Sequence, residues 1–162
     1  MLKLSKKSEY ALMALQSLGN LAAGERIAVP MLAEQRGIPK DLLAKVMQQL
    51  KRAGLVHSSQ GVSGGYALAR PLTAITFLDA VGPFEEALGL APCVDRNSEG
   101  CDRADCCSLH DPMEALNRWL MAQLSTLSLA EFVAARPPVV HGCVKAPRQP
   151  TSMERRPLPC EA

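Results

Sequence analysis

The feature that most constrains the fold is a pair of short strand-like runs around a glycine-rich turn, placed directly after a helical segment. Residues 55–58 form the first run, residues 60–65 the turn, and residues 66–68 the returning run. Glycine accepts the positive φ angles that tight turns need. Proline lacks the amide that would continue a strand ladder, so Arg70-Pro71 ends the second run. The segment therefore predicts a β-hairpin.

Three helical segments precede this hairpin, and glycine or proline marks their ends. We expect helices over residues 5–23, 30–37 and 39–53, with a short extended piece over 26–29. Gly24 and Gly37 are expected to end the first two helices, and Gly54 suits the position just after the third. Pro30 suits a first helical turn, where its missing amide hydrogen has no partner to lose.

The third helical segment has an apolar stripe and a basic remainder. The stripe consists of Leu42, Leu43, Val46, Met47 and Leu50. Lys40, Lys45, Lys51 and Arg52 stand away from most of it. Two helices joined near Gly37 are typical of a generic helical hairpin or of a helix-turn-helix. A β-hairpin directly after the second helix favours the helix-turn-helix with a wing. We therefore expect a mainly α fold with a small β-hairpin.

Composition limits the class of protein. The 162 residues are 48% apolar and 4% aromatic, enough for one compact domain with a largely aliphatic core. No apolar run reaches the ~18 residues of a membrane span. The N-terminal segment resembles a secretory signal, but Glu9, Gln16 and Asn20 interrupt its apolar stretch. We interpret it as a mature helix of a cytoplasmic protein without a membrane partner.

Charge divides the chain into three parts. Residues 1–70 carry ten Lys or Arg against four Asp or Glu, and residues 71–135 carry three against ten. Residues 136–162 carry five against two. A basic front joined to an acidic middle favours a polyanion-binding module attached to a different kind of element. The alternative is that charged residues are distributed unevenly over a solvated surface by chance.

The acidic middle contains a cysteine-rich loop. Four of the six cysteines lie between residues 93 and 107, and His110 follows closely. The polar loop offers few apolar neighbours, so packing does not account for these thiols. Disulfides need an oxidising compartment, and zinc sites usually show paired short spacings. An iron–sulfur cluster takes thiolates at wider spacing and accepts histidine, so we favour it over the other two.

After the loop, the sequence predicts a long amphipathic helix and a second short one. Asp111 is expected as the N-cap of the long helix, with Pro112 at its first position and Glu114 completing a capping box. Its apolar stripe runs through Leu116, Trp119 or Leu120, Gln123 or Leu124, and Leu127. Such a stripe packs either on its own domain or on a partner chain. Residues 128–131 cap the short helix, which ends near Ala135.

The end of the chain differs in composition from the rest. Six prolines crowd residues 136–162, which predicts a disordered tail. Cys143 and Cys160 lie in that tail, too remote to be first-choice ligands. The expected organisation is a DNA-binding domain over residues 1–82, the cysteine loop and a dimerisation helix over 83–135, and the tail over 136–162.

Several of these segments together resemble the Rrf-two family of bacterial winged-helix regulators, which includes IscR, NsrR and RirA. The resemblance covers about residues 1–135. It lies in residues 8–12, 38–56 and above all 61–68, whose Gly-x-x-Gly-Gly-Tyr-x-Leu wing precedes a cysteine loop. The resemblance implies a homodimer paired through a long helix. It also implies an iron–sulfur cluster, 2Fe–2S or 4Fe–4S, whose state switches repression or activation.

The family's three cysteines map onto Cys93, Cys101 and either Cys106 or Cys107. Cys107 gives a spacing similar to the iron-responsive branch and places His110 where IscR-like proteins carry a histidine ligand. Glu9 matches the position from which some relatives supply a carboxylate of the partner subunit. His110 and Glu9 therefore compete as the fourth ligand. A polar residue beside a cap and a solvated charge are their structural alternatives.

These observations together predict a DNA-binding transcription regulator, expected to be a repressor, and not an enzyme. The third helix is expected in the major groove of double-stranded operator DNA, and the wing along the backbone or in the minor groove. The expected DNA contacts are Lys40, Lys45, Ser59, Gln60, Ser63, Gly64 and Gly65. Two alternatives are a small iron–sulfur electron carrier and a metal-free thiol sensor of the same fold.

Overall fold

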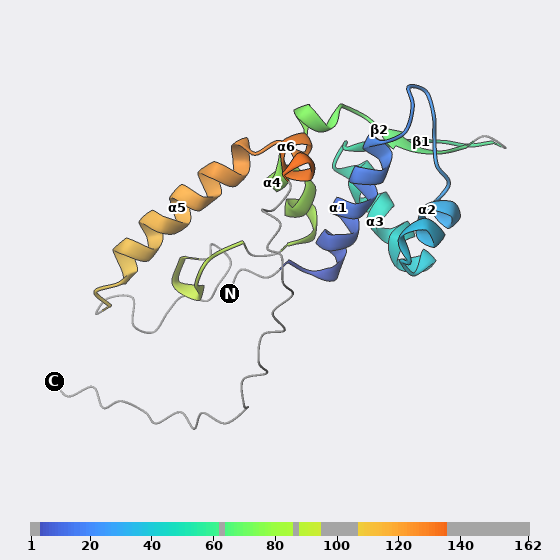
Figure 1. The fold of residues 1–162 in the computed structure, drawn as a ribbon. Coiled ribbons are helices and arrows are strands. Elements are labelled where there is room, and N and C mark those ends of the chain that lie inside the picture. The colour runs from blue at the N-terminus through green and yellow to red at the C-terminus, as the bar shows by residue number, and fades with distance from the viewer. Residues whose placement is uncertain (1–3, 62–63, 86–87, 95–106, 136–162) are drawn as a thin grey trace, which may run out of the picture.

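The structure, a computed structural model, describes residues 4–61, 64–85, 88–94 and 107–135. It is mainly helical, with one two-stranded antiparallel sheet among the described residues. Figure 1 shows a cluster of helices that carries the hairpin, and a long helix that projects from it. The helices and strands are α1 (Lys6–Gly19), α2 (Val29–Arg36), α3 (Lys40–Arg52), β1 (Val56–Ser59), β2 (Gly65–Leu68), α4 (Phe77–Val81), α5 (His110–Thr126) and α6 (Leu129–Ala134).

Helix α1 is shorter than the sequence predicts. The Ser5 side chain caps it by accepting a hydrogen bond from the Ser8 amide, as expected for serine at an N-cap. It ends at Gly19, whereas the prediction extended it to residue 23. Gly19 and Asn20 both have weak helix propensity, and the Asn20 amide closes the last turn onto Ser17 and Leu18. Gly24 instead serves the following turn, with φ +85°.

Helices α2 and α3 confirm the predicted helix-turn-helix. Gly37 ends α2 in the left-handed conformation, with φ +62° and ψ +33°, where a side chain is strained. Its amide closes the helix onto the Ala33 and Glu34 carbonyls. Pro39 occupies the N-cap position of α3, and Gly54 lies just beyond the C-cap with φ +70°. Each predicted boundary of α3 lies within one residue of the observed one.

A single aliphatic core holds these helices together. Leu15, Leu43, Met47 and Leu50 from α1 and α3 are completely buried, and Leu32 from α2 joins them. The apolar stripe predicted for α3 is confirmed except at Leu42, which is 42% exposed. Leu42 precedes Leu43 by one position, which rotates it by about 100° around the helix and away from the core.

The hairpin pairs β1 with β2 in antiparallel register, with Val56 opposite Leu68 and Ser59 opposite Gly65. The predicted extended piece before α2 joins it at one point. Ile27 and Tyr66 exchange backbone hydrogen bonds of 3.1 and 2.9 Å, which places a third segment beside the wing. The wing is therefore fixed to the helical domain on both sides.

Helices α4 and α6 lie side by side and begin with the same local motif. Thr76 and Ser128 each form a capping box, with Asp79 and Glu131 respectively. The Phe77 amide donates to the Leu127 carbonyl and the Leu129 amide to the Ile75 carbonyl, both at 2.8 Å. Leu129 is 1% exposed, so the segment after the long helix returns to the same core. The predicted short helix after residue 128 is confirmed.

Helix α5 projects away from this core (Figure 1), and none of its 17 residues is buried. It begins at His110 rather than after Asp111, so the predicted N-cap at Asp111 is wrong. Leu109 occupies the cap position and makes no side-chain cap hydrogen bond. Asp111 lies in the first turn, where its negative charge still favours the helix dipole.

Within the described ranges, no helix is both long enough and apolar enough to cross a membrane. The predicted disordered tail, with Cys143 and Cys160, lies outside the described residues.

Candidate nucleic-acid interface and cysteine site

The outer face of α3 carries the basic residues that the sequence singled out. Lys40 and Lys45 are exposed, whereas Val46 and Met47 of the same helix are buried in the core. Helix α3 is strongly amphipathic, so burial of its apolar stripe determines which side chains face solvent. Packing within the chain therefore presents both lysines on a fixed helix.

A polar contact joins the end of α2 to α1. The Arg36 Nε donates to the Ser17 Oγ at 2.6 Å, and the Ser17 hydroxyl donates to the Met13 carbonyl at 2.9 Å. Ser17 is 9% exposed, so this network is largely shielded from water. The helix-turn-helix is consequently held on α1 by hydrogen bonds as well as by apolar packing.

The wing is tied directly to α3. The Lys51 Nζ donates to the Ser58 Oγ at 2.8 Å, which joins the end of the helix to strand β1. Ser59 and Gln60 stand at the start of the turn, half-buried and exposed respectively. Ser63, another expected DNA contact, lies outside the described residues.

The two glycines at the end of the wing turn have a structural explanation. A Cβ on Gly65 would lie 2.7 Å from the carbonyl carbon and oxygen of Ile27, and a Cβ on Gly64 would lie 2.7 Å from the Ser59 carbonyl oxygen. Backbone atoms at such distances leave no space for a side chain. The expectation from the sequence is that the glycines of the turn permit positive φ angles and a close approach to phosphates. In the described turn Gly61 has the positive angle, φ +117°, while Gly64 and Gly65 permit tight packing within the chain.

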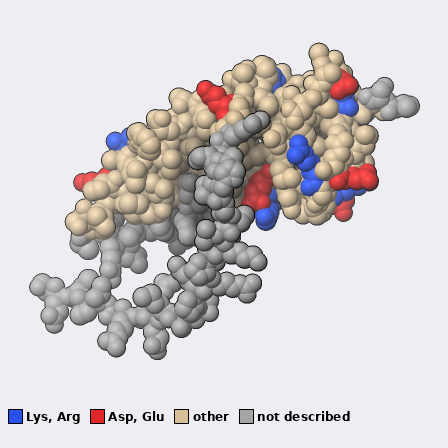
Figure 2. All heavy atoms as spheres, in the orientation of Figure 1, with Lys and Arg blue, Asp and Glu red and all other residues tan. Residues whose placement is uncertain are grey.

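The described surface carries most of its charged side chains on the helical cluster. Figure 2 shows Lys and Arg side chains mostly over the helical cluster, while the face of the projecting α5 drawn there is mainly uncharged. Acidic groups also lie on the helical cluster (Figure 2), so this face carries charges of both signs. The exposed Lys40 and Lys45 of the helix-turn-helix are suited to the phosphate backbone of DNA.

The first candidate metal ligand, Cys93, lies in a short 3-10 turn, Pro92–Val94, packed against α5. Asn117 of α5 holds this turn on both sides. Its Oδ1 accepts from the Leu90 amide at 3.1 Å, and its Nδ2 donates to the Val94 carbonyl at 3.3 Å. Cys93 is half-buried and forms no disulfide. Asn117 is thus the residue that positions this cysteine, although nothing in its local sequence indicates it.

Cys107 and His110 lie at the start of α5. The His110 amide donates to the Cys107 carbonyl at 3.1 Å, so the two residues share one turn. Cys107 is exposed and has no disulfide partner. The His110 Nδ1 lies 3.1 Å from the Asp111 carboxylate. When Nδ1 carries the proton, Nε2 is left with a free lone pair, which is the form in which histidine binds a metal.

Glu9 lies in the first turn of α1, where its carboxylate contacts the Lys6 Nζ at 2.6 Å. Hydrogen bonding to Glu9 raises the pKa of Lys6. Both side chains are substantially exposed, so the pair contributes little to stability and leaves Glu9 accessible. The neighbouring Ser8 is completely buried and donates its hydroxyl to Glu85, another residue that sequence reasoning missed.

Two of the proposed cysteine ligands and the histidine are therefore described, and Cys101 and Cys106 lie outside the described residues. Within the described ranges, no three Cys, His, Asp or Glu side chains are grouped closely enough to hold a metal. The available donors, thiols without disulfides and an imidazole, are those that iron–sulfur clusters use. The donor chemistry fits a cluster that the intervening loop would complete.

The projecting helix presents an apolar surface. Leu109, Leu116 and Trp119 are 64%, 49% and 60% exposed, and they recur at helical spacing on one face. Leu124 and Leu127 instead pack against the core. The predicted stripe thus differs along its length. Its last part, at the C-terminal end of α5, packs on the core, and the exposed row of Leu109, Leu116 and Trp119 is here named the outer face of α5. Exposed tryptophan and leucine in a row are typical of a surface covered by a partner.

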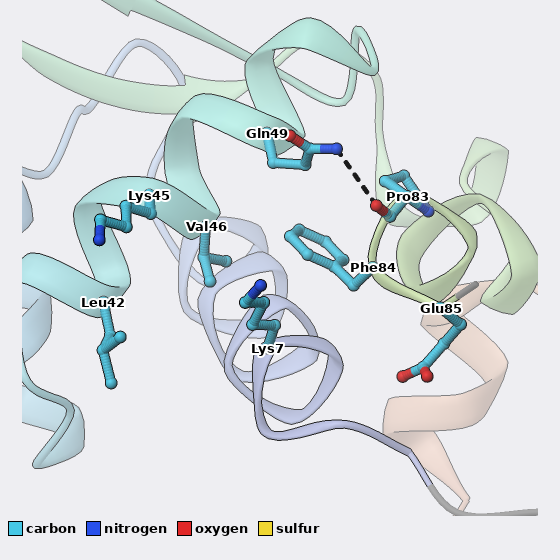
Figure 3. Close-up of a pocket in the computed structure, with 8 residues that line it drawn as sticks. All are labelled: Lys7, Leu42, Lys45, Val46, Gln49, Pro83, Phe84 and Glu85. Atoms are coloured by element: carbon cyan, nitrogen blue, oxygen red, sulfur yellow. Dashed lines mark hydrogen bonds between the residues drawn. The ribbon is translucent and has the colours of Figure 1, made fainter.

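A cavity of about 290 Å³ separates α3 from the segment after α4. Figure 3 shows Val46 and Gln49 of α3 on one side and Pro83 and Phe84 on the other, with Lys7 of α1 below. The Gln49 Nε2 donates to the Pro83 carbonyl at 3.1 Å across the cavity edge. The exposed Leu42 also lines it.

Comparison with known proteins agrees with this architecture. Residues 4–135 match the family model Rrf2, described as an iron-dependent transcriptional regulator. The protein aau3 of Rhizobium meliloti is 32% identical over 140 residues, which cover 85% of this chain and 89% of that protein. A protein of Azotobacter vinelandii named as an HTH-type transcriptional regulator, ORF2, is 29% identical over 133 residues, 82% of this chain and 80% of its own.

Solved structures share the fold. A protein of Listeria innocua named as a transcriptional regulator has a TM-score of 0.71 at 20% identity, covering 86% of this chain and 93% of its own. IscR of T. potens has a TM-score of 0.62 at 25% identity, covering 82% and 87%. The oxidized form of Staphylococcus aureus CymR has a TM-score of 0.65 at 20% identity, covering 84% and 99%.

The family match covers most of the chain and includes the helix-turn-helix, the wing and the long helix. Its members are transcriptional regulators that bind DNA, so neither an enzyme nor an electron carrier is supported as the class of this protein. The expectation of a winged-helix regulator is confirmed. The chain belongs to the Rrf2 family of transcriptional regulators.

Proposed function

We propose that this regulator binds operator DNA as a homodimer and that an iron–sulfur cluster on the 93–107 loop switches its affinity. The observation that carries the proposal is the placement of Cys93 and Cys107. Both are free of disulfides, and they bracket the segment that joins the winged-helix domain to α5. The family description as iron-dependent supports the same interpretation. Repression in the cytoplasm is the expected role.

Cys93, Cys101 and Cys107 would hold the cluster, with His110 or the partner subunit's Glu9 as the fourth ligand. A cluster supplies a centre whose binding and charge respond to iron, redox state or nitric oxide. Asn117 holds the Cys93 turn on α5, and the first turn of α5 carries His110. These residues would therefore place at least two of the ligands on one rigid helix. Cys106 is the alternative to Cys107.

DNA binding is assigned to α3 and the wing. Helix α3 would enter the major groove with Lys40 and Lys45 toward phosphates or base edges, and the wing around residues 59–65 would follow the backbone or the minor groove. The Lys51–Ser58 hydrogen bond supports the joint placement of the two elements. Affinity should fall steeply with salt, because each lysine bound to a phosphate releases counterions.

The dimer is assigned to the outer face of α5. Leu109, Leu116 and Trp119 form an exposed apolar row on a helix with no buried residue of its own. A crossing pair of α5 helices would cover this row and set the separation of the two α3 helices, about one DNA turn or ~34 Å. Losing the cluster would free the loop before α5 and so change that separation.

Single cysteine variants test the assignment. Cys107→Ala is expected to abolish the cluster and fix DNA affinity at the apo value, because it removes a thiolate ligand. Cys106→Ala, Cys143→Ala and Cys160→Ala are the matched controls and should leave both properties nearly unchanged. Visible absorbance and DNA titrations of anaerobically purified protein give the two readouts. A Cys107→Ala protein with a full cluster, or a Cys106→Ala protein with none, would contradict the assignment.

A second candidate is a regulator of the same fold that senses through its thiols without a metal. The exposed thiol of Cys107 favours it, as does the fold similarity to CymR, a structure of which is described as an oxidized form. Iron and sulfide analysis of anaerobically purified protein separates the two candidates. Stoichiometric iron and sulfide support the cluster, and their absence with reversible loss of free thiols supports thiol sensing.

A further inference from the structure

The segment Gly82–Glu85, here named the strap, connects α4 to the cysteine loop and contacts two helices of the DNA-binding domain. On one side, the Pro83 carbonyl accepts the hydrogen bond of 3.1 Å from the Gln49 side chain of α3. On the other, the Glu85 carboxylate accepts from the Ser5 amide at 2.7 Å and from the Ser8 hydroxyl. The strap therefore bridges α3 and the start of α1.

The contact between the strap and α3 is incomplete. The 290 Å³ cavity lies between them, lined by Leu42, Val46 and Phe84 as well as by the two lysines Lys7 and Lys45. A tightly packed contact resists displacement, whereas a gap of this size lets the strap move without losing many contacts. The hydrogen bond from Gln49 to Pro83 thus joins α3 to the strap at the edge of this cavity (Figure 3).

The contact between the strap and α1 is the firmer one. Ser8 is completely buried, and its hydroxyl and the Ser5 amide both point at one carboxylate oxygen of Glu85. Hydrogen bonds to an ionised acceptor are stronger than those between neutral groups. Glu85 therefore anchors the strap, and Gln49 transmits its position to α3.

The place of the strap in the chain gives this bridge a consequence. Seven residues separate Glu85 from Cys93, and Asn117 fixes the short turn that contains Cys93 on α5. A change in the geometry of the cysteine loop must reach the DNA-binding domain through the two ends of that loop. The strap precedes the N-terminal end of the loop, and its Pro83 carbonyl is hydrogen-bonded to α3.

We propose that the strap couples the cysteine loop to α3, with Glu85 as its anchor and Gln49 as the positioning residue of the recognition helix. This inference rests on the proposed switching of DNA binding by the loop and names the contacts that carry it. Gln49 acts through the placement of α3. Loss of its hydrogen bond should therefore change the difference in DNA affinity between cluster-loaded and cluster-free protein more than it changes the affinity of either form.

The first experiment tests the bridge itself, in the full-length, metal-free chain. The side-chain amide signals of Gln49 and Gln48 are assigned by NMR in the wild-type protein and in Glu85→Ala. Removing the anchor should shift the Gln49 signals and leave those of Gln48 unchanged, because Gln48 is exposed on the same helix and makes no such bond. Glu85→Gln keeps an acceptor oxygen for Ser5 and Ser8 and should restore the wild-type Gln49 signals.

The second experiment tests coupling to DNA. The ratio of DNA dissociation constants between cluster-free and cluster-loaded protein is measured for wild type, Gln49→Met and the control Gln48→Met. Gln49→Met keeps the length of the side chain but cannot donate the hydrogen bond. We expect it to reduce the ratio by roughly fivefold, the lower end of typical allosteric couplings. The melting temperature of both variants should stay near that of wild type, because neither position is in the core.

The two experiments fail in different ways. Gln49 signals that do not respond to Glu85→Ala, or a Gln49→Met ratio equal to that of Gln48→Met, would overturn the strap. A wild-type protein with the same DNA affinity in its cluster-loaded and cluster-free forms would contradict the proposed function instead. In that case the NMR comparison alone tests the contacts of the strap.

Discussion

Helices α3 and α5 are both amphipathic, but they differ in how much of their apolar surface is buried. Helix α3 buries Leu43, Val46, Met47 and Leu50 within 13 residues, whereas α5 buries none of its 17. Helix α3 is also bonded to the wing through Lys51. Helix α5 is bonded to its own chain mainly through Asn117, which holds the turn that carries Cys93.

This difference separates α3, the helix assigned to DNA recognition, from α5, the helix assigned to regulation. The position of α3 is determined by a core that folding itself supplies, so its lysines are presented in a fixed arrangement. Helix α5 contacts α4 and the Cys93 turn and packs on the core through Leu124, but none of its side chains is fully buried and its outer face is open. A helix of this kind responds to whatever covers it or binds beside it, because little packing within the chain opposes its movement.

The largest expected difference is in folding stability. Leu50→Ala should lower the free energy of unfolding by about 2–5 kcal/mol, because it removes a completely buried side chain and leaves a cavity. Leu116→Ala on α5 is the matched control and should change the stability of the winged-helix domain by less than about 0.5 kcal/mol. Urea unfolding followed by circular dichroism measures both. Equal losses would mean that α5 is part of the same core.

The wing offers the next largest effect. Gly65→Ala should destabilise the protein by about 1–3 kcal/mol, since its Cβ would lie 2.7 Å from the Ile27 carbonyl group and force the backbone apart. Gly82→Ala is the control. No atom lies within 4 Å of its Cβ position and its backbone is helical, so a small gain of about 0.4–1 kcal/mol is expected. Thermal melts that rank the two variants in the opposite order would refute the packing explanation.

The outer face of α5 should matter for association rather than for folding. Trp119→Ser removes the largest exposed apolar group of that face and should weaken the dimer at least about tenfold, as for an aromatic residue at the centre of an interface. Sedimentation velocity across a range of concentrations measures the change. Glu114→Gln, on the same helix, should leave the dimer intact. A Trp119→Ser protein as dimeric as wild type would place the interface elsewhere.

The smallest effect concerns the strap and depends on pH. Burial alone would raise the pKa of Glu85, but hydrogen bonds from Ser8 and Ser5 outweigh it and hold the pKa below its ordinary value of about 4.5. Because the pKa is lowered in the folded state, the carboxylate stabilises the protein above about pH 4.5, and this contribution is lost as the pH falls through the folded-state value. The stability difference between wild type and Glu85→Gln should therefore shrink from pH 6 to pH 3. A difference independent of pH would contradict this account.

Local patterns were sufficient to predict most of the fold. The left-handed glycines at 37 and 54, the wing and the capping box at Ser128 all follow from residues close together in the sequence. The errors are also local. Asp111 has the residue type of an N-cap, but the cap is Leu109 and the helix begins at His110, two residues earlier than predicted. Leu42 has the right hydropathy for the stripe but the wrong angle around the helix.

The residues that sequence reasoning missed are those whose partners are distant in the chain. Gln49 bonds to Pro83, Asn117 to Leu90 and Val94, and Glu85 to Ser5 and Ser8. Each is a polar side chain with no distinctive local spacing, so only the tertiary structure brings the partners together. The cysteines and His110 are predicted as ligands because thiols are rare and their clustering has few explanations, and that assignment stays a prediction.

The most direct test of the central claim is a DNA titration in two states of the same protein. Anaerobically purified protein with its iron and sulfide quantified, and the same sample after chelation, are titrated with labelled DNA from the protein's own promoter region at one salt concentration. The account predicts salt-sensitive, sequence-preferring binding whose affinity differs between the states by about tenfold or more, a coupling within the usual allosteric range. Equal affinities, or protein that contains no iron and sulfide, would contradict it.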